Sequence, residues 1–335
     1  MSAPLDITVV VNDLPGLHAR QTTFLLARAA AERGHSVHVA GIWDLGWSGQ
    51  AVQVTRRPFR LGADDAATLA ACAQAPVSTV DLGPGRSVLL RTNPGRDEDS
   101  AAVHAAGLTL LSLARDRGAL VLNDPGVLMA MASKLNTLDL PDIARVPGIV
   151  TSDVARARRF VEQADGPCVL KPLVGTRGVG VHLVQQGQTP PLGTPLEDAL
   201  AQLGGRGPIL AQRKVAGSEQ GDTRVVLLNG RCLESQGRRA AVRRVPPPAD
   251  FRSNIAVGGA PAEAIWTPEL EAVVDAVGPW LREKGVWLAG LDVISGRVIE
   301  VNVFSTGGLF DAVRLEGADF PGAIVQDLER QAADA

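Results

Sequence analysis

The sequence predicts a mixed α/β protein (α+β in parts) that begins with a Rossmann-like parallel sheet. Short apolar segments alternate with helical periodicities from residue 7 to residue 122, a pattern typical of parallel strands joined by helices. Apolar residues make up 45% of the chain and charged residues 21%, a balance that indicates a folded globular protein. The length of 335 residues exceeds what one core of average size accommodates, so we expect two or three packed units.

The first expected unit covers residues 1–124. Its buried strand Ile7–Val11 leads into a helix over Ala19–Arg33 that ends before Gly34. Further expected elements are strands over Ser36–Ala40, Ser87–Leu90 and Ala119–Leu122 and a helix over Ala101–Arg117. Ligands of parallel sheets bind beyond the carboxyl ends of the strands, so residues 12–16 and 91–97 are candidate site loops.

Two more units are expected, over residues 125–208 and 209–335. The expected elements of the second unit are helices over Met129–Leu138, Val154–Gln163 and Leu196–Leu203 and strands over Cys168–Leu173 and Val179–Val184. Those of the third unit are strands over Val225–Leu228, Val286–Ile294 and Val298–Phe304 and a helix over Pro268–Lys284. Thr267 as N-cap and Gly285 as terminator mark the ends of that helix. Residues 243–254, with three consecutive prolines, are expected to form a loop.

Composition and charge exclude several classes of protein. The formal net charge is −3, which leaves no basic surplus for nucleic-acid binding. No stretch approaches the roughly 18 consecutive apolar residues of a membrane helix. The cysteines Cys72, Cys168 and Cys232 are far apart and form no CxxC pair, which argues against zinc and disulfides. We therefore expect a cytoplasmic protein that binds neither nucleic acid nor membrane.

A glycine-rich segment, KPLVGTRGVGV at residues 171–181, is a candidate phosphate-binding loop. Glycines expose backbone N–H groups and let phosphate approach closely. The segment continues into the strand pattern VGVHLV, whereas a dinucleotide fingerprint or a Walker loop opens into a helix. No Gly-x-Gly-x-x-Gly follows Val11, so a nicotinamide-dependent oxidoreductase is disfavoured. The remaining interpretations are a hairpin that covers phosphates, with Lys171 projecting from its first strand, or a plain flexible hairpin.

Three polar residues interrupt the apolar strands near the C-terminus, namely Asp292, Glu300 and Asn302. Glu300 and Asn302 share one face of their strand. If residues 295–297 form a three-residue turn, Asp292 lies across from Glu300 and three oxygen-bearing side chains converge, which suits Mg²⁺ or Mn²⁺. A two-residue turn would place Asp292 on the wrong face. The alternative is the polar outer face of an edge hairpin.

Arginines form a third candidate set. Arg224 starts an apolar strand, and Arg244, Arg252 and Asn254 follow in the expected loop. Guanidinium groups near a metal–phosphate centre neutralise the charge of a transferring phosphoryl group or a tetrahedral oxyanion. Of the 33 basic residues, 29 are arginine, so most arginines are expected on the solvated surface.

These motifs, taken in order along the chain, resemble the ATP-grasp ligases and most of all the bacterial glutathione synthetase group. The resemblance rests on Lys134, KPLVGTRGVGV, AQRKV (211–215), DTRVVLLNG (222–230), RSNIAVGG (252–259) and the pair LDV…EVN. RTNPGRD (91–97) and ALVLNDPGVL (119–128) also resemble that group's substrate-domain segments. The resemblance implies a two-subdomain ATP-grasp fold after the N-terminal, substrate-binding domain.

The resemblance also implies roles for individual residues. Those implied to bind the nucleotide are Lys134, Lys171, Gly175, Thr176, Arg177, Gly178, Gly180, Gln212, Arg213, Lys214, Val215 and Asp222. Those implied as metal ligands are Asp292, Glu300 and Asn302, as catalytic residues Arg224 and Arg244, and as substrate-binding residues Arg91, Arg252, Asn254 and Ser305.

The activity implied by the resemblance is ATP- and Mg²⁺-dependent (or Mn²⁺-dependent) ligation of a carboxylate to an amine through an acyl phosphate. Both substrates would be small molecules, an amino acid or a short peptide, with γ-glutamylcysteine and glycine as the first choice and a homo-oligomeric enzyme expected. Val174 and the segment FSTGG (304–308) depart from the glutathione synthetase pattern where substrate is expected to bind. Another amino-acid or glutamate ligase is therefore the alternative, followed by an inactive ATP-binding protein.

Overall fold

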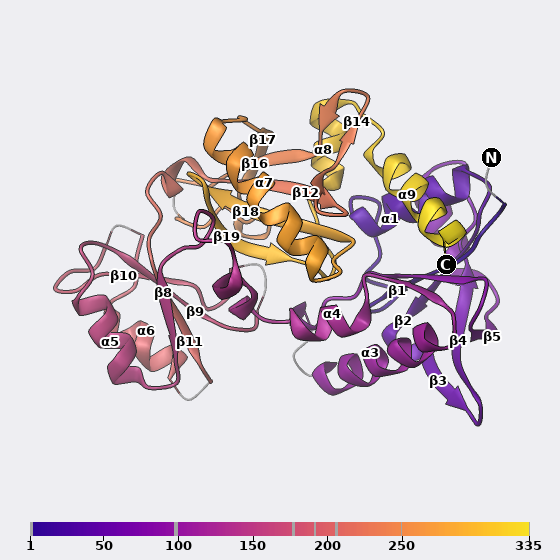
Figure 1. Ribbon diagram of the computed structural model, residues 1–335, viewed down its shortest axis with the longest axis horizontal. Coiled ribbons are helices and arrows are strands. Elements are labelled where there is room, and N and C mark those ends of the chain that lie inside the picture. The colour runs from indigo at the N-terminus through magenta and orange to yellow at the C-terminus, as the bar shows by residue number, and fades with distance from the viewer. Residues whose placement is uncertain are drawn as a thin grey trace.

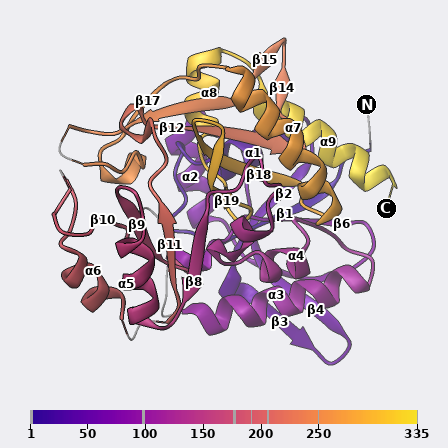
Figure 2. The same cartoon turned by 60° about the vertical axis from the view of Figure 1, so that its left-hand side comes forward.

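The structure is a computed structural model that describes residues 3–96, 100–175, 178–190, 192–204, 207–248 and 250–334. The chain forms an N-terminal sheet, a small sheet and a C-terminal sheet (Figure 1). In both views the small sheet lies to one side of the C-terminal sheet, away from the two chain ends (Figures 1 and 2). Within the described ranges, no helix combines the length and apolarity needed to cross a membrane.

The N-terminal sheet has a parallel centre, as predicted. Its strands are β1 (Asp6–Val11), β2 (Ser36–Gly41), β3 (Leu45–Ser48), β4 (Ala51–Pro58), β5 (Ser78–Leu82), β6 (Arg86–Leu90) and β7 (Leu120–Leu122). Strands β2, β1, β6 and β7 are parallel neighbours in that order, and β3 to β5 add an antiparallel extension beyond β2 that was not predicted. The apolar run in β1 is buried on both faces, as is typical of central parallel strands.

Helices cover both faces of this sheet. They are α1 (Thr22–Glu32), α2 (Asp65–Gln74) and α3 (Ala101–Asp116). Ile7 and Val9 of β1 pack in one core with Phe24 of α1, whereas Val10 packs in another core with Leu111 of α3. The first helix begins at Thr22 and not at Ala19 as predicted, since the chain before it turns at residues 14–21.

The loops after β1 and β6 lie together at the carboxyl edge of the N-terminal sheet. The Asn12 side chain donates to the carbonyl oxygen of Asn93 at 2.9 Å and accepts from the Asn93 backbone N–H at 2.8 Å. These paired bonds hold both loops at the edge where parallel sheets bind ligands.

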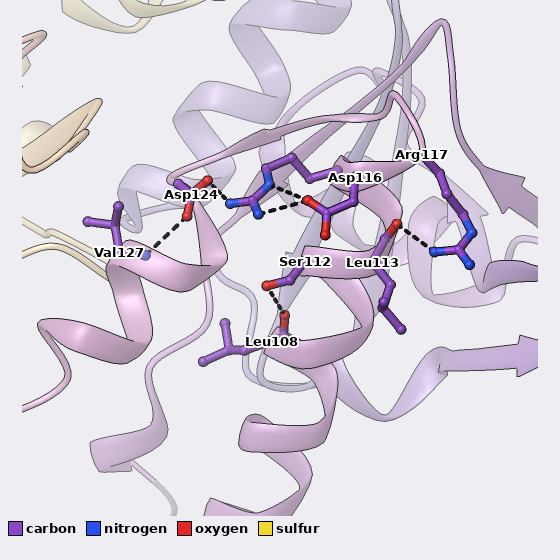
Figure 3. Close-up of polar contacts among 8 residues, drawn as sticks. Leu108, Ser112, Leu113, Asp116, Arg117, Asp124 and Val127 are labelled. Atoms are coloured by element: carbon purple, nitrogen blue, oxygen red, sulfur yellow. Dashed lines mark hydrogen bonds and ion pairs between the residues drawn. The ribbon is translucent and has the colours of Figure 1, made fainter.

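A cluster of polar side chains holds the end of α3 against the segment that leads from the N-terminal sheet to the next helix (Figure 3). Arg115, near the end of α3, pairs with both Asp116 and Asp124. Asp124 also caps α4 (Pro125–Ala130) by accepting from the Val127 N–H at 3.1 Å. The helix predicted over Met129–Leu138 is therefore wrong. The segment is α4 followed by a 3₁₀ helix over Lys134–Asp139, because Asp124 and Pro125 supply an earlier N-cap and first helical position.

The small sheet is antiparallel and has its own core. Its strands, in the order β10-β9-β11-β8, are β8 (Gly148–Thr151), β9 (Cys168–Pro172), β10 (His182–Val184) and β11 (Ile209–Arg213). Helices α5 (Val154–Glu162) and α6 (Leu196–Leu203) pack on it, with Ala157, Leu170 and Leu200 in the core. The unit boundary expected between residues 208 and 209 lies directly before β11. Because β11 pairs with β8 and β9, it belongs to the small sheet.

The C-terminal sheet completes the fold. Its strands are β12 (Asp222–Leu228), β13 (Arg231–Cys232), β16 (Ala241–Val245), β17 (Ala260–Glu263), β18 (Leu288–Ile294) and β19 (Arg297–Asn302), beside a hairpin of β14 (Glu234–Ser235) and β15 (Arg238–Arg239). The expected loop over 243–254 begins later than predicted, because Arg243–Val245 pair with β12 and β17.

Three helices accompany the C-terminal sheet, namely α7 (Pro268–Glu283), α8 (Leu309–Glu316) and α9 (Phe320–Asp334). Helix α9 returns to the N-terminal sheet and lies beside α1 (Figures 1 and 2), where Leu328 shares a core with Leu26. A second core joins Val88 of the N-terminal sheet to Leu291 of the C-terminal sheet. These two sheets thus share their hydrophobic cores, while the core of the small sheet is separate.

Candidate active site

A cavity of about 940 Å³, which includes the space at its mouth, lies between the small sheet and the C-terminal sheet. Fourteen of the residues predicted to act at the site line it, namely Lys134, Lys171, Gly175, Gly178, Gln212, Arg213, Lys214, Val215, Asp222, Arg244, Arg252, Asn254, Asp292 and Glu300. Gly180 is not among its lining residues, and Thr176 and Arg177 lie outside the described residues.

Part of the lining of this cavity is apolar. Val146, Val169 and Ile294 line it beside Val215, the last residue of the segment expected to meet adenine. Gln212 is buried and pairs in register with Val169 across β11 and β9. Sequence analysis missed these apolar lining residues, because buried aliphatic residues occur throughout both strands and periodicity does not distinguish a cavity wall from a core.

Two lysines line the cavity, of which Lys171 is buried and Lys134 is partly buried. Lys134 Nζ donates to the carbonyl oxygen of Gly175 at 3.0 Å, and Lys171 Nζ donates to that of Ile299 at 3.2 Å. Within the described residues neither ammonium group forms an ion pair. Burial lowers the pKa of both lysines, against the attraction of Glu300. Buried charge without a counter-ion is costly, so the site is suited to an anionic ligand such as a polyphosphate.

A chain of arginine–carboxylate ion pairs connects neighbouring strands of the C-terminal sheet. Arg224 binds Asp292 with two bonds of 2.5 and 2.7 Å, and Arg244 bridges Asp292 at 2.6 Å and Asp222 at 2.7 Å. The hydroxyl of Ser253 donates to the other oxygen of Asp222. Burial opposes ionisation of Asp292, but Arg224 and Arg244 hold its pKa below the usual range. Burial and the charge of Asp292 raise the pKa of Asp222.

The pairing of Asp292 with Glu300 occurs as predicted, but the predicted turn is wrong. Ile294 pairs with Arg297, which leaves a two-residue turn at Ser295 and Gly296, both with positive φ. A register shift between Asp292 and Val293 restores the expected pairing, because Asp292 lies opposite Glu300 while Val293 lies opposite Val298. The extra residue, Ile299, forms a β-bulge. The carbonyl oxygen of Ile299 is the one that accepts the Lys171 bond.

Asp292, Glu300 and Asn302 offer only oxygen donors suited to a hard cation. Glu300 makes no hydrogen bond or ion pair with a described residue, and burial together with the charge of Asp292 raises its pKa. The side-chain nitrogen of Asn302 is buried without a hydrogen-bond partner in the same part of the chain. Two carboxylates and an amide fit a divalent cation of the Mg²⁺ or Mn²⁺ type. Among the described residues, no group of three or more His, Cys, Asp and Glu forms a metal cluster.

A second cavity adjoins the first, since Arg244, Asn254 and Glu300 line both. It also takes in the predicted residues Arg224, Asn302 and Ser305. Asn93 of the candidate loop 91–97 also lines it, whereas the lining residues His18, Arg20, Phe310 and Asp311 were not predicted. His18 and Arg20 lie just beyond the candidate loop 12–16, so the rule that ligands bind beyond strand ends would have included them if the loop had been extended to the start of α1 at Thr22.

Two arginines expected to bind substrate make contacts within the protein. Arg91 lines none of the cavities described above and donates to the carbonyl oxygens of Phe304 and Thr306 at 3.4 and 2.9 Å. Its guanidinium group therefore supports the segment FSTGG. Arg252 pairs with Asp250 and donates to the carbonyl oxygen of Gly178 at 2.8 Å, so it joins the glycine-rich loop to the C-terminal sheet.

Alanine at Gly178 is expected to weaken ATP binding about tenfold. Gly178 has a φ of +75°, and an added Cβ would lie 3.1 Å from both Arg252 Cδ and Asn254 Oδ1. A side chain in this conformation costs about 1–3 kcal/mol, and the loop would lose its fit to the Arg252 contact. The KM for ATP measures the effect. Gly187→Ala is the control, because its φ is +73° with no atom within 4 Å of the added Cβ. A KM equal in both variants would contradict the prediction.

ATP binding is also expected to weaken as the pH rises. Burial lowers the pKa of Lys171 to about 8, with Lys134 acting in the same direction and Glu300 and Asp292 opposing it. The ammonium loses its proton as the pH rises through this value, so ATP should bind about tenfold more weakly at pH 9 than at pH 7. Calorimetric titration measures this, and Lys171→Met should bind weakly with a flat profile. A flat profile for the unaltered protein would refute the prediction.

Two family models match most of the chain. The model of the prokaryotic glutathione synthetase N-terminal domain matches residues 5–128, and the model of the ATP-grasp domain of the same enzymes matches residues 133–317. Among curated proteins, the glutathione synthetase of Xanthomonas axonopodis pv. citri is 31% identical over 332 residues, which are 98% of this chain and 99% of that one. That of Ralstonia nicotianae is 30% identical over 318 residues, 94% and 92% of the two chains.

Solved structures share the fold at low sequence identity. A crystal structure of the D-cycloserine synthetase DcsG superposes with a TM-score of 0.64 at 15% identity, over 97% of this chain and 99% of that one. The ATP-grasp ligase PsnB, complexed with a minimal precursor, gives a TM-score of 0.60 at 21% identity, over 98% and 100% of the two chains. These likenesses show the ATP-grasp fold, consistent with the order of the sheets.

Proposed function

Since the chain belongs to the prokaryotic glutathione synthetase family and is an ATP-dependent enzyme of the ligase class, we propose that it joins γ-glutamylcysteine to glycine. The observation that carries the proposal is the pair of adjoining cavities. Lys171, which is buried, and Lys134, which is partly buried, line the first cavity, and Glu300 and Arg244 line both. A nucleotide in the first cavity would present its terminal phosphate where the two meet, next to a substrate in the second.

The proposed reaction has two steps. The carboxylate of the cysteine residue of γ-glutamylcysteine attacks the γ-phosphorus of ATP, and ADP leaves to give an acyl phosphate. The amine of glycine then attacks the acyl carbon, the C–O bond to phosphate breaks, and an amide forms with loss of a proton. Lys134 and Lys171 would hold the phosphates during the first step, and Arg224 and Arg244 would stabilise the oxyanion of the second.

A divalent metal is part of this proposal, with Mg²⁺ as the proposed ion. Asp292, Glu300 and Asn302 would hold it, and when bound it supplies charge neutralisation at the phosphates. The protein must also exclude water, because an acyl phosphate hydrolyses readily. The contact of Arg252 with Gly178 and that of Lys134 with Gly175 would hold the glycine-rich loop over the cavity.

ADP release across a grid of donors and acceptors tests the proposal. The donors include γ-glutamylcysteine and free glutamate, and the acceptors include glycine and other amino acids, all with ATP and Mg²⁺. We expect ADP only when γ-glutamylcysteine and glycine are both present, together with glutathione identified by mass spectrometry. Turnover with another pair would overturn the substrates and retain the ligase chemistry. That outcome would favour the alternative raised by Val174 and FSTGG, a ligase for other amino acids.

A further inference from the structure

A third cavity is lined by segments that follow strands of all three sheets. Its volume is about 570 Å³, including the space at its mouth. Residues 93–95 after β6, residues 131–136, the start of the glycine-rich loop and the end of β19 line it. Lys134 and Glu300 line both this cavity and the first one, so the third cavity adjoins the proposed metal site. Its lining also includes Asn136, to which the proposed reaction gives no role.

Asn136 connects the 3₁₀ helix over Lys134–Asp139 to the strand of the proposed metal ligands. Its side-chain nitrogen donates to the carbonyl oxygen of Val301 in β19 at 3.3 Å. Val301 stands between Glu300 and Asn302 in the sequence. One hydrogen bond from the helix that begins with a cavity lysine therefore reaches the backbone between two of the proposed ligands.

Strand β19 needs such a connection because it lies at an edge of the C-terminal sheet. It is the last strand in the order of that sheet, and among the described residues it pairs with one strand, β18. The outer edge of such a strand presents N–H and C=O groups without a partner strand. Single contacts from outside the sheet hold this strand instead. The Val298 N–H donates to the carbonyl oxygen of Ala144 at 2.8 Å, and Asn136 holds the end that bears the proposed ligands.

Two polar atoms of the lining residues have no hydrogen-bond partner in the described part of the chain. Asn136 Oδ1 and Asn302 Nδ2 are both buried without one. Asn136 donates to the carbonyl oxygens of Met131 at 3.2 Å and Val301 at 3.3 Å, so its other side-chain atom is the acceptor. A buried acceptor without a donor is costly, so a ligand is expected to supply one. Mg²⁺ keeps several water ligands in proteins, and these waters are donors.

We propose that Asn136 is a positioning residue of the metal site, which holds Glu300 and Asn302 in place through Val301 and accepts a hydrogen bond from a water of the hydrated cation. The proposal rests on the metal of the proposed function and is independent of which carboxylate and amine are joined. The bond to Met131 caps the end of α4. That role alone would leave the Val301 bond and the buried oxygen unexplained.

Binding of Mn²⁺ as a probe tests the proposal without catalysis. Mn²⁺ is titrated calorimetrically into the protein with one equivalent of a non-hydrolysable ATP analogue, and the analogue alone is the blank. Asn136→Leu keeps the approximate size and removes both the donor and the acceptor. We expect the Kd for Mn²⁺ to rise about 10- to 100-fold, the usual effect of removing a residue that supports metal ligands. The affinity for the analogue without metal should be unchanged, because the cavity lysines remain.

Thr137→Val is the matched control in the same 3₁₀ helix. It removes the 2.7 Å bond from the Thr137 hydroxyl to the carbonyl oxygen of Lys134 and leaves the contact with β19 intact, so it should keep the affinity for Mn²⁺. Asn136→Ala is a second variant that adds no bulk and should show the same rise in Kd, and thermal melting shows whether each variant is folded. The positioning role is overturned if a folded Asn136 variant binds Mn²⁺ as tightly as the unaltered protein, or if Thr137→Val weakens binding equally.

Glu300→Gln distinguishes failure of the positioning role from failure of the proposed metal site. Weaker Mn²⁺ binding by Glu300→Gln, with unchanged binding by Asn136→Leu, would support the metal site and overturn the positioning role. Unchanged binding by both variants would overturn the metal site together with the positioning role. Turnover of a pair other than γ-glutamylcysteine and glycine, with Mn²⁺ binding that Asn136→Leu weakens, would refute the proposed substrates and support the positioning role.

Discussion

Replacing Glu300 with glutamine is expected to reduce ADP formation at least about 1,000-fold while leaving the fold intact. Glu300 lies opposite Asp292, lines both cavities and is one of the two carboxylates proposed to hold the metal. Glutamine keeps the shape and removes the charge, and loss of one charged group that acts on the transition state costs several kcal/mol of barrier. Steady-state ADP release with saturating substrates measures the effect.

The same substitution should not destabilise the protein without ligands. Burial and the charge of Asp292 raise the pKa of Glu300, so its ionised form is disfavoured in the free protein and a neutral amide removes that cost. The melting temperature without nucleotide should be unchanged or higher, and the further rise produced by Mg²⁺ and ATP should be lost. Glu263→Gln, at an exposed position of β17, is the control and should keep both. Turnover of Glu300→Gln within threefold of the unaltered enzyme would refute the assignment.

Some of this site could be predicted from sequence because its features are local. Continuous apolar runs such as Ile7–Val11 predict the parallel strands, because such a run is buried on both sides only in a sheet that is covered on both faces. Glu300 and Asn302 share a face because they are two residues apart. The family motifs lie in order along the chain, so residues from the small sheet and the C-terminal sheet could be assigned together.

Other features depend on contacts that no local pattern records. The alternation of side chains along the strands does not reveal the bulge at Ile299. The turn is one residue shorter than expected and the bulge adds one residue to β19, so the two changes cancel and Asp292 still lies opposite Glu300. Arg91 donates to the backbone carbonyls of Phe304 and Thr306, and Arg252 donates to that of Gly178, contacts that join segments far apart in the sequence. Helices α8 and α9 were not predicted either, since their apolar residues, such as Leu328, are buried against α1 from the other end of the chain.

Replacing Arg244 with glutamine is expected to lower the free energy of unfolding by about 3–5 kcal/mol, the usual cost of removing one partner from a buried ion pair. Arg244 bridges Asp222 and Asp292, all three being buried. Without it the two carboxylates repel each other with only Arg224 and Ser253 as remaining partners. Urea unfolding measures the loss. Arg239→Gln, which removes half-exposed ion pairs with Glu234 and Glu271, should cost about 1 kcal/mol or less.

The loss caused by Arg244→Gln should depend on pH in a defined direction. Burial and Asp292 already raise the pKa of Asp222 in the folded protein, and removal of the Arg244 charge raises it further. A carboxyl group whose folded pKa exceeds its unfolded value stabilises the fold at low pH and loses this contribution as the pH rises through the folded pKa. The deficit relative to the unaltered protein should therefore be smaller at about pH 5 than at about pH 8. A deficit that does not change between these pH values would mean that Arg244 stabilises the fold by packing and not by its charge.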